Sequence, residues 1–442
     1  MKILVLSNYP WEKTNSFGNT YSSLFGKVSN TEIDHIYMFD GQPDTETNIT
    51  AYYQIPEREV MSSFFRRRRG KGAGRIIEPK KNHIEEKSAP KEKSVSLYYK
   101  ILRFGKRNHS SLLFMAREFV WKHGRVNYDG LIDFVKSFQP DLFFLPYSNT
   151  FYTNRIALYI KEHYDVPLVV EMAMDHYSLN RVSYNPLFWI DRFSKRRIIR
   201  KLADKSEMFY AISKKLKEEI ENDLGVPCKV LYKTPDKTRM VSLYTQAKVN
   251  EVRFLFTGNI YANRWRSLAL LASELKREQF GHLDIYTASP ITKAIDKALN
   301  VDGFSSIHSP VSQEKVIKLQ NAADVLVHVE AFDRYNKSLV RCAISTKIMD
   351  YLSAGRCILA IGPSDISSVE YLSDNGLAII ANSKQDLSKQ VTRIRENISV
   401  ITEYAGRCRD FVRYHLDEDA IRESFYNDLQ SIINQFLCLK PK

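Results

Sequence analysis

One segment of the sequence combines the residue types that bind a diphosphate. Ser345 and Thr346 directly precede a predicted helix that carries Lys347 and Asp350. The first turn of a helix presents backbone N–H groups with no partner inside the helix, and these groups attract anionic oxygens. A nearby cation adds to the attraction, and a carboxylate one turn further in suits ribose hydroxyls. The segment predicts a nucleoside diphosphate site, and the alternative is an ordinary capped helix start.

Further residues in the same half of the chain suit this ligand. Gly258 and Asn259 follow a short apolar run, which predicts a turn from a strand into a helix. Arg264 begins that helix, and Arg341 lies shortly before the first segment. Arginine presents a planar fork of donors that matches phosphate oxygens. The alternatives are a simple strand end at Gly258 and a solvent-facing helix residue at Arg264.

The elements that must position these residues follow an alternating pattern. Short apolar runs alternate with segments of helical spacing, which predicts parallel sheets flanked by helices. The pattern stops in polar residues after 235 and restarts near 252. We expect doubly wound α/β domains at residues 1–240 and 250–410, with helices at 411–442 packing back on the first. Two such domains form a cleft at the carboxyl ends of their strands, where ligands bind.

Two segments carry a resemblance to a known enzyme family. Residues 321–330 read NAADVLVHVE, and residues 345–363 read STKIMDYLSAGRCILAIGP. In order and spacing they resemble the donor-binding part of the large retaining GT-B-fold glycosyltransferase family (family four type, group 1). Residues 203–236, which contain AD, AIS, LGVP and TPD in turn, resemble the end of the family's first domain. The resemblance implies two Rossmann-like domains facing a cleft, with C-terminal helices crossing back.

The resemblance also assigns roles in the second domain. The family usually has a Glu at the position of Asp350, where it accepts hydrogen bonds from the ribose. Another Glu often lies eight residues earlier, but this chain has Cys342 there. The paired-carboxylate motif is therefore incomplete, and Glu330, Asp333 or another residue would have to orient the donor sugar.

The cations of the family are also only partly present. Many members have Arg directly after the glycine at 258 and Lys five residues later, both directed at the diphosphate. This chain has Asn259 and Arg264 at those positions, so one cation is lost. Arg341 and Lys347 could compensate for it.

In the first domain the resemblance marks a loop glycine and the end of a strand. Gly18 occupies the loop that approaches the donor phosphate in this family, and its alternative is a plain turn glycine. Glu171, Asp175 and His176 follow an apolar run and are candidates for contact with the acceptor or the transferred sugar. A structural role for His176 is the alternative.

Charge is concentrated in one stretch of the 442-residue chain. Residues 66–93 contain eleven Lys or Arg and four Glu, a net of +7 out of +14 for the whole protein. We expect a flexible insertion at about 57–109. Cations suited to an anionic membrane surface occur there and beside aromatic residues in a later predicted helix; they are Arg66, Arg67, Arg68 and Arg69, and Arg192, Lys195, Arg196, Arg197, Arg200 and Lys201. The alternative is that both runs are solvated faces.

The remaining composition narrows the function class. No apolar run could cross a bilayer, and the N-terminus turns polar too soon for a secretory signal, so we expect a cytoplasmic protein, peripheral on the inner face of the cell membrane. Five cysteines without a C-x-x-C pair disfavour disulfides and zinc. No metal or other cofactor is expected.

We expect a retaining glycosyltransferase that uses a nucleotide-sugar donor and a saccharide or lipid-linked acceptor in cell-surface polysaccharide synthesis. The alternatives are a nucleotide-sugar epimerase of the same fold, a non-catalytic member that binds a partner, and a basic nucleic-acid-binding protein. The last is disfavoured because no nucleic-acid motif accompanies the charge, and no nucleic-acid partner is expected.

Overall fold

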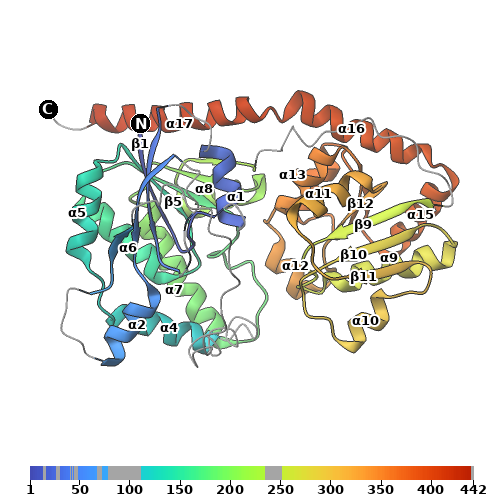
Figure 1. The fold of residues 1–442 in the computed structure, drawn as a ribbon, viewed down its shortest axis with the longest axis horizontal. Coiled ribbons are helices and arrows are strands. Elements are labelled where there is room, and N and C mark those ends of the chain that lie inside the picture. Colours follow the sequence, from blue (N-terminus) through green and yellow to red (C-terminus); the bar gives the residue numbers. More distant parts are fainter. Residues whose placement is uncertain are drawn as a thin grey trace.

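The computed structural model describes residues 1–12, 16–25, 30–39, 41, 43, 48–66, 72–77, 111–233 and 251–439. Within these residues, two β-sheets are each covered by helices on both faces, and two long C-terminal helices run along both (Figure 1). The expected fold class is confirmed: two doubly wound α/β domains lie beside each other, and C-terminal helices cross back to the first.

The first sheet has eight strands: β1 (Lys2–Ser7), β2 (Glu32–Tyr37), β3 (Ile49–Gln54), β4 (Arg75–Ile77), β5 (Leu142–Pro146), β6 (Leu168–Met172), β7 (Met208–Ala211) and β8 (Cys228–Val230). Their order is β4-β3-β2-β1-β5-β6-β7-β8, and only β4 is antiparallel to its neighbour. The chain builds outward from β1 in one direction and then from β5 in the other. The loops after β1 and β5 therefore diverge, which creates a crevice at their carboxyl ends.

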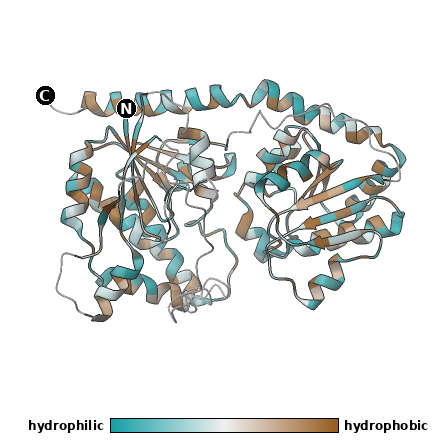
Figure 2. Cartoon of the chain, viewed as in Figure 1, coloured by the Kyte–Doolittle hydropathy of each residue, from teal (hydrophilic) through white to brown (hydrophobic). Residues whose placement is uncertain are grey.

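Seven described helices cover this sheet: α1 (Ser16–Phe25), α2 (Glu57–Arg66), α4 (Ser111–His123), α5 (Tyr128–Phe138), α6 (Phe151–His163), α7 (Pro186–Ala203) and α8 (Lys214–Leu224). Alternate residues of β1 enter different cores. Leu4 and Leu6 pack with residues of α5 to α8, whereas Ile3 and Val5 pack with α1. Burial on both faces explains why the central strands β1, β5 and β6 are mainly apolar (Figure 2).

The second sheet has six strands: β9 (Arg253–Thr257), β10 (His282–Tyr286), β11 (Ser305–His308), β12 (Val325–Val329), β13 (Cys357–Ile361) and β14 (Ile379–Ala381). Their order is β11-β10-β9-β12-β13-β14, and all neighbours pair in parallel. The direction of building reverses between β9 and β12, so the second crevice lies at their carboxyl ends. The predicted diphosphate-binding residues follow these two strands.

Seven helices of the second domain connect these strands: α9 (Arg264–Glu278), α10 (Lys293–Leu299), α11 (Gln313–Ala322), α12 (Arg334–Val340), α13 (Thr346–Ala354), α14 (Ser367–Asp374) and α15 (Lys384–Glu396). Gly355 ends α13 in the left-handed conformation with φ 59°, and its N–H donates to the Leu352 carbonyl. A glycine suits this position because a Cβ would be strained there.

The C-terminal helices join the two domains. α16 (Ser399–His415) packs along the second sheet, where the Cys408 thiol donates to the Leu377 carbonyl at 3.1 Å. α17 (Glu418–Leu439) continues across the first domain, and Phe425 packs against Phe25 and Phe144 with ring centroids 5.4 and 5.9 Å away. The Arg422 guanidinium donates to the Ser23 carbonyl. α17 therefore supplies part of the first domain's core.

The insertion predicted at about 57–109 begins as part of the first domain, which corrects that expectation. α2 places Val60 in the main core, and Glu57 forms a buried ion pair with Arg117 of α4. β4 then extends the sheet by pairing with β3. Residues 67–71 and 78–110 lie outside the described residues, as do residues 234–250 at the predicted domain boundary.

Gly74 explains why the sequence predicted flexibility where the structure has a packed edge strand. It directly precedes β4 with φ 153°, and a Cβ at this position would lie 2.3 Å from the Tyr53 hydroxyl oxygen. The glycine thus allows the edge strand to pack closely on a buried tyrosine. Glycine and charge together indicated flexibility, but here the glycine serves close packing.

Candidate active site

The site is organised by the contact between Gly258 and Lys347. Gly258 follows β9 with φ 131°, and its N–H donates to the Tyr286 carbonyl at 2.8 Å. A Cβ at this position would lie 1.9 Å from the Lys347 Nζ. Both the conformation and the close approach require glycine. The turn after β9 and the first turn of α13 therefore meet through one ammonium group.

Lys347 lies near an aromatic ring and Arg264, and the carboxylates of Glu330 and Asp350 also act on its charge. Its Nζ lies 5.0 Å from the centroid of the Phe256 ring. Burial lowers the pKa of Lys347 to about 8, and repulsion from Arg264 adds to this effect. An ammonium group whose charge costs this much gains from an anion placed beside it.

Arg264, which begins α9, is fixed by a carboxylate at the end of β12. Its Nε and Nη2 donate to the two oxygens of Glu330 at 2.9 and 2.8 Å. The Glu330 side chain is only 3% exposed, and its carbonyl accepts from the Ser267 hydroxyl at 2.7 Å. The structure places Arg264 close enough to Lys347 for the two charges to repel each other. Glu330 orients the guanidinium and balances its charge.

The start of α13 retains the features expected of an anion site. Ser345 is the N-cap residue, and its hydroxyl makes no capping hydrogen bond. Ser345, Thr346 and Lys347 are all half-buried. Asn259, on the opposite turn, has an exposed side chain. The first-turn amides of α13 therefore do not have the serine side chain as an acceptor.

Asp350 pairs with a residue of the first domain. Its Oδ1 accepts from the Lys233 Nζ at 2.9 Å. Lys233 lies just after β8, and nothing in the sequence pattern connected it with Asp350. The predicted ribose-binding carboxylate therefore lies at the domain interface.

Arg341 faces the first domain as well. Its guanidinium donates to both oxygens of Glu219 in α8, and it reaches Asp175 Oδ2 at 3.3 Å and the Ser178 hydroxyl at 3.1 Å. Burial alone would lower the pKa of Arg341, but hydrogen bonds to Glu219 raise it above its ordinary value. In this arrangement Arg341 joins the domains and is not grouped with Arg264 and Lys347. Its predicted role in donor binding requires these contacts to open.

The position of the absent family Glu has a carboxylate close by. The Cys342 thiol is buried and lies 3.9 Å from Glu219 Oε2, and the Cys342 carbonyl accepts from the Ser213 hydroxyl at 2.7 Å. Glu219 comes from the first domain, so no sequence spacing within the second domain could have identified it.

The three predicted residues at the end of β6 and in the loop that follows have different environments. The Glu171 carboxylate is buried and accepts from the Tyr21 hydroxyl at 2.5 Å, and burial raises its pKa to about 7. Burial, followed by the charges of Lys195 and Arg192, lowers the pKa of His176 to about 3, so the imidazole is neutral near pH 7.

Asp175 organises the loop after β6. It pairs with Arg192 at 2.7 Å and accepts from the Ser178 N–H at 2.9 Å and hydroxyl at 2.5 Å. Burial acts to raise the pKa of Asp175, but Arg192 and these hydrogen bonds outweigh it and lower the pKa. These contacts are structural, and they leave Asp175 beside Arg341 at the domain interface.

Gly18 lies in a different element from the one predicted. It belongs to the first turn of α1 and not to the preceding loop. A Cβ at this position would lie 2.1 Å from the Glu12 carbonyl oxygen. The close approach that the glycine permits is therefore to the backbone of its own domain.

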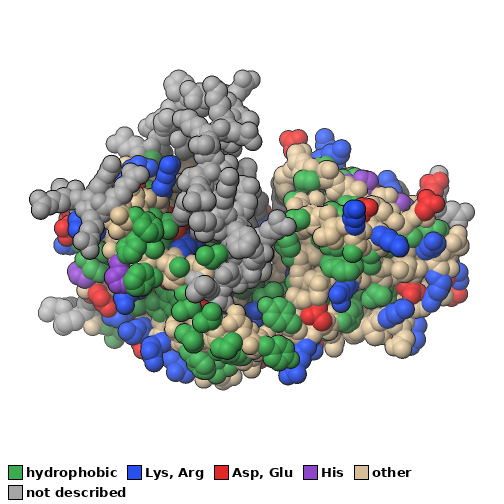
Figure 3. Space-filling model, turned by 90° about the horizontal axis from the view of Figure 1, so that it is seen from below, with side chains coloured by type: hydrophobic (Ala, Val, Ile, Leu, Met, Phe, Trp, Pro, Cys, Tyr) green, Lys and Arg blue, Asp and Glu red, His purple; other side chains and the backbone are tan. Residues whose placement is uncertain are grey.

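The predicted membrane-facing run in α7 is only partly a surface. Arg192 and Lys195 are buried, which corrects the prediction for these two residues. The exposed residues follow one stripe of the helix: Ile190, Phe193, Arg197, Arg200 and Lys201. The underside of the molecule shows hydrophobic and basic side chains together on the first domain (Figure 3). Among the described helices, none is long and apolar enough to cross a membrane.

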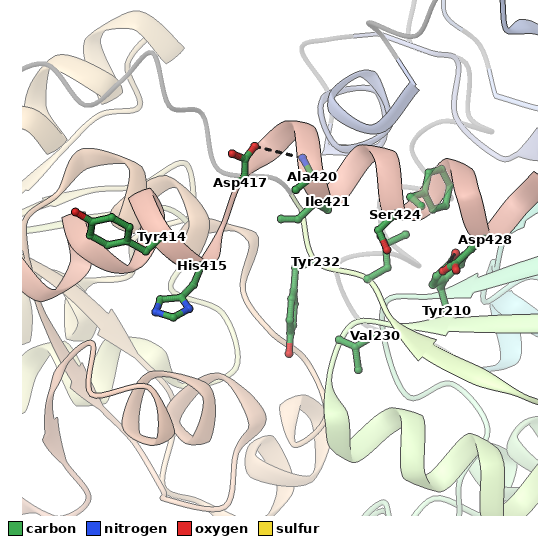
Figure 4. Close-up of a pocket in the computed structure, with 12 residues that line it drawn as sticks. Tyr210, Val230, Tyr232, Tyr414, His415, Asp417, Ala420, Ile421, Ser424 and Asp428 are labelled. Carbon is green, nitrogen blue, oxygen red and sulfur yellow. Dashed lines mark hydrogen bonds between the residues drawn. The ribbon is translucent and has the colours of Figure 1, made fainter.

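A cavity of about 360 Å³ lies where α16 meets α17, away from the predicted site residues (Figure 4). Tyr210 and Tyr232 of the first domain line it together with Tyr414 and His415 of α16. Asp417 accepts from the Ala420 N–H at 3.3 Å, where α17 begins. The cavity follows the bend between the two helices.

Comparison with known proteins identifies the fold. No protein-family model and no curated protein matches the sequence. Sucrose-phosphate synthase from Thermosynechococcus elongatus matches with a TM-score of 0.60 and 10% identity, over 98% of this chain and 99% of that one. HepE from Anabaena, in complex with UDP-glucose, matches with a TM-score of 0.61 and 10% identity, over 98% and 100%. The chain therefore has the GT-B fold that the sequence resemblance implied.

Proposed function

We propose that this protein is a glycosyltransferase that moves a sugar from a nucleotide diphosphate donor to a saccharide or lipid-linked acceptor. The observation that carries the proposal is the grouping of Gly258, Arg264 and Lys347 at the carboxyl ends of β9 and β12. An ammonium group beside a bare glycine backbone and a helix start is suited to a diphosphate. The solved complex of HepE with UDP-glucose makes a uridine diphosphate sugar the first donor to test.

In this proposal, catalysis consists of positioning and charge stabilisation. Lys347, Arg264 and the first-turn amides of α13 stabilise the charge that develops on the departing diphosphate. Asp350 holds the ribose, which requires it to share or exchange its contact with Lys233. The acceptor enters from the first domain, so that its hydroxyl meets the anomeric carbon in the cleft. We propose retention of configuration and a place in cell-surface polysaccharide synthesis from the family resemblance.

The first experiment is donor binding followed by turnover. UDP, GDP and ADP are compared by thermal shift, because a ligand that binds only the folded state raises the melting temperature. Release of free UDP from UDP-glucose is then measured with and without added acceptor saccharides. Acceptor-dependent release supports transfer, whereas conversion of the donor without release indicates epimerisation.

Variants locate the reaction. Arg264→Ala and Asp350→Ala should each reduce transfer about a hundredfold, in line with the loss of a charged contact in the transition state. Lys297→Ala is the control, since this exposed lysine lies on α10. Full activity in both site variants, with intact folding, would remove the assignment.

Membrane association is a separate part of the proposal. The exposed stripe of α7 combines Ile190 and Phe193 with Arg197, which suits an interface with anionic lipid. Flotation with vesicles that contain phosphatidylglycerol should recover the protein, and pure phosphatidylcholine vesicles should recover less. A Phe193→Ser variant that floats as well as the wild type would contradict this surface assignment.

A further inference from the structure

A basic cavity of about 400 Å³ lies between the two domains, beside the candidate donor site. It is lined by Val182, Lys215, Phe332, Arg334, Lys337, Ser338, Arg341 and Asp365. Four of these eight residues are cationic and one is acidic. Such a composition favours an anionic ligand, provided that some of the cations are not already paired.

Most of the cavity cations have partners, but one does not. Lys215 donates to the Asp365 carbonyl at 2.6 Å, and Lys337 pairs with the Asp365 carboxylate at 2.7 Å. Arg341 is held by Glu219. Arg334 is exposed and forms no ion pair with any residue that the structure describes. Its guanidinium is therefore available to a ligand in the cavity.

A second guanidinium, that of Arg181, lies next to the cavity with its Cζ 5.8 Å from the centroid of the Phe188 ring. Arg181 precedes Val182, whose N–H donates to the Ser338 hydroxyl at 3.1 Å. The Arg181 side chain is half-buried, and its Nε is buried without a hydrogen-bond acceptor in the described part of the chain. The Nε of Arg341 is buried without an acceptor in the same way.

These unsatisfied donors carry an energetic cost. A buried donor without a partner destabilises the folded protein, and more so when the group is charged. Burial lowers the pKa of Arg181, and the neighbouring charge of Arg192 lowers it further. A negatively charged oxygen placed between Arg181 and Arg341 would satisfy both groups and relieve their repulsion.

One loop of the second domain, residues 330–333, contributes to both the cavity and the donor site. Phe332, which lines the cavity, lies two residues after Glu330, the partner of Arg264. Asp333 accepts from the Asn263 amide at 3.1 Å, next to Arg264. The same short loop therefore lines the cavity and carries the carboxylate that holds Arg264.

We propose that this cavity binds an oxyanion carried by the acceptor saccharide, held by Arg181, Arg334 and Arg341. The inference rests on the proposed glycosyl transfer and adds the chemical class of the acceptor. A phosphate monoester and a sugar carboxylate share the required oxygens and charge. The experiment distinguishes these two sources.

The full chain is titrated by calorimetry with glucose 6-phosphate, glucuronate, glucose and inorganic phosphate at low ionic strength. We expect one of the charged sugars to bind at least about tenfold more tightly than glucose, because a charged hydrogen bond is worth about 1.5–3 kcal/mol. The charged sugar that binds more tightly shows whether the oxyanion of the acceptor is a phosphate monoester or a carboxylate. Equal affinity for glucose 6-phosphate and inorganic phosphate would overturn the assignment to a saccharide.

The double variant Arg181→Gln with Arg334→Ala should lose this preference by about tenfold or more, since both unpaired guanidinium groups are removed. Lys297→Ala, on the exposed side of α10, should keep it. Without ligand, the double variant should remain folded, because Arg181 gives up its contact with the Phe188 ring but no ion pair with the described residues. Unchanged binding of the charged sugar in a folded double variant would overturn the proposal.

Titration with UDP separates this inference from the proposed function. The double variant should bind UDP within about twofold of the wild type, because the changed residues lie outside the diphosphate site. If UDP fails to bind any form of the protein, the proposed transfer fails, and the acceptor class fails with it. If UDP binds but no charged sugar does, only the acceptor class is overturned.

Discussion

At the scale of single residues, the candidate donor site depends on the close contact between Lys347 and the backbone of Gly258. Gly258 leaves the space that the Lys347 ammonium occupies, and Arg264 is oriented nearby by Glu330. The cost of burying the Lys347 charge lowers its pKa to about 8. Such a site is preorganised for an anion, because its cations are already positioned in the absence of the ligand.

Gly258→Ala should weaken UDP binding by about tenfold or more, because the new Cβ would displace the Lys347 ammonium. The reason is the 1.9 Å separation between that Cβ position and the Nζ. Gly303→Ala is the matched control, since Gly303 also has a positive φ, 76°, but nothing lies within 4 Å of its Cβ position. Calorimetry with UDP measures the difference. Equal losses in both variants would show that backbone strain alone is responsible.

The affinity for UDP should fall as pH rises through about 8, because Lys347 loses its proton and its charge there. The fall can reach about tenfold per pH unit above the pKa of the free protein. Lys347→Met should bind weakly and without this dependence. Titrations at pH 7, 8 and 9 measure it, and a flat profile in the wild type would contradict the role of Lys347.

The same group should affect stability with the opposite sign. Its pKa in the folded protein is about 8, below its ordinary value of 10.5, so between these values the unfolded chain binds more protons. The contribution of Lys347 to stability therefore rises with pH in this window while UDP affinity falls. Urea unfolding of wild type and Lys347→Met at pH 8 and 10 isolates this contribution.

At the scale of elements, the C-terminal helices are part of both domains. α16 packs on the second sheet, and α17 completes the core of the first around Phe425. Phe25, Phe144 and Tyr210 surround that ring from three different elements. A helix that supplies core residues cannot leave the first domain without a large cost in buried area.

Phe425→Ala should lower the free energy of unfolding by about 3–5 kcal/mol, as expected for removal of a buried aromatic ring. Tyr414→Ala is the control, because Tyr414 is 71% exposed near the end of α16. Urea unfolding followed by fluorescence measures both. If Phe425→Ala lowers the free energy of unfolding by less than about 1 kcal/mol, α17 contributes little to the core of the first domain.

At the scale of the whole molecule, ion pairs hold the two domains together, and each domain supplies the cation in some pairs and the carboxylate in others. Arg341 of the second domain meets Glu219 of the first, whereas Lys233 of the first meets Asp350 of the second. Lys215 adds a contact with Glu370 at 2.6 Å. Two of these residues, Arg341 and Asp350, belong to the predicted site, so the arrangement of the domains and the occupancy of the site are linked.

Glu219→Gln should loosen this arrangement, because Arg341 would lose its charged bidentate partner and keep the contacts with Asp175 and Ser178. Small-angle scattering of the unliganded protein should show a larger radius of gyration than the wild type. Glu221→Gln is the control on the same helix, since Glu221 pairs with Lys217 within α8. Identical scattering from Glu219→Gln and wild type would show that the other contacts suffice.

The sequence by itself determined the two doubly wound domains, the C-terminal crossover and the grouping of Gly258, Arg264 and Lys347. These features depend on local apolar patterns and on residues close to strand and helix ends, which adjacent positions specify. The prediction of a flexible insertion was wrong at 57–66 and 72–77. These residues form α2 and β4, which pack around the buried side chains of Val60 and Tyr53.

Only the tertiary structure decided how the charges pair. Glu219 and Arg341 are 122 positions apart, as Lys233 and Asp350 are 117 apart, and each pair joins separate domains. The tertiary structure also decided that the Arg181 Nε is buried without a hydrogen-bond acceptor among the described residues. A side chain's partner depends on the placement of the domains, and no periodicity in the sequence encodes that placement.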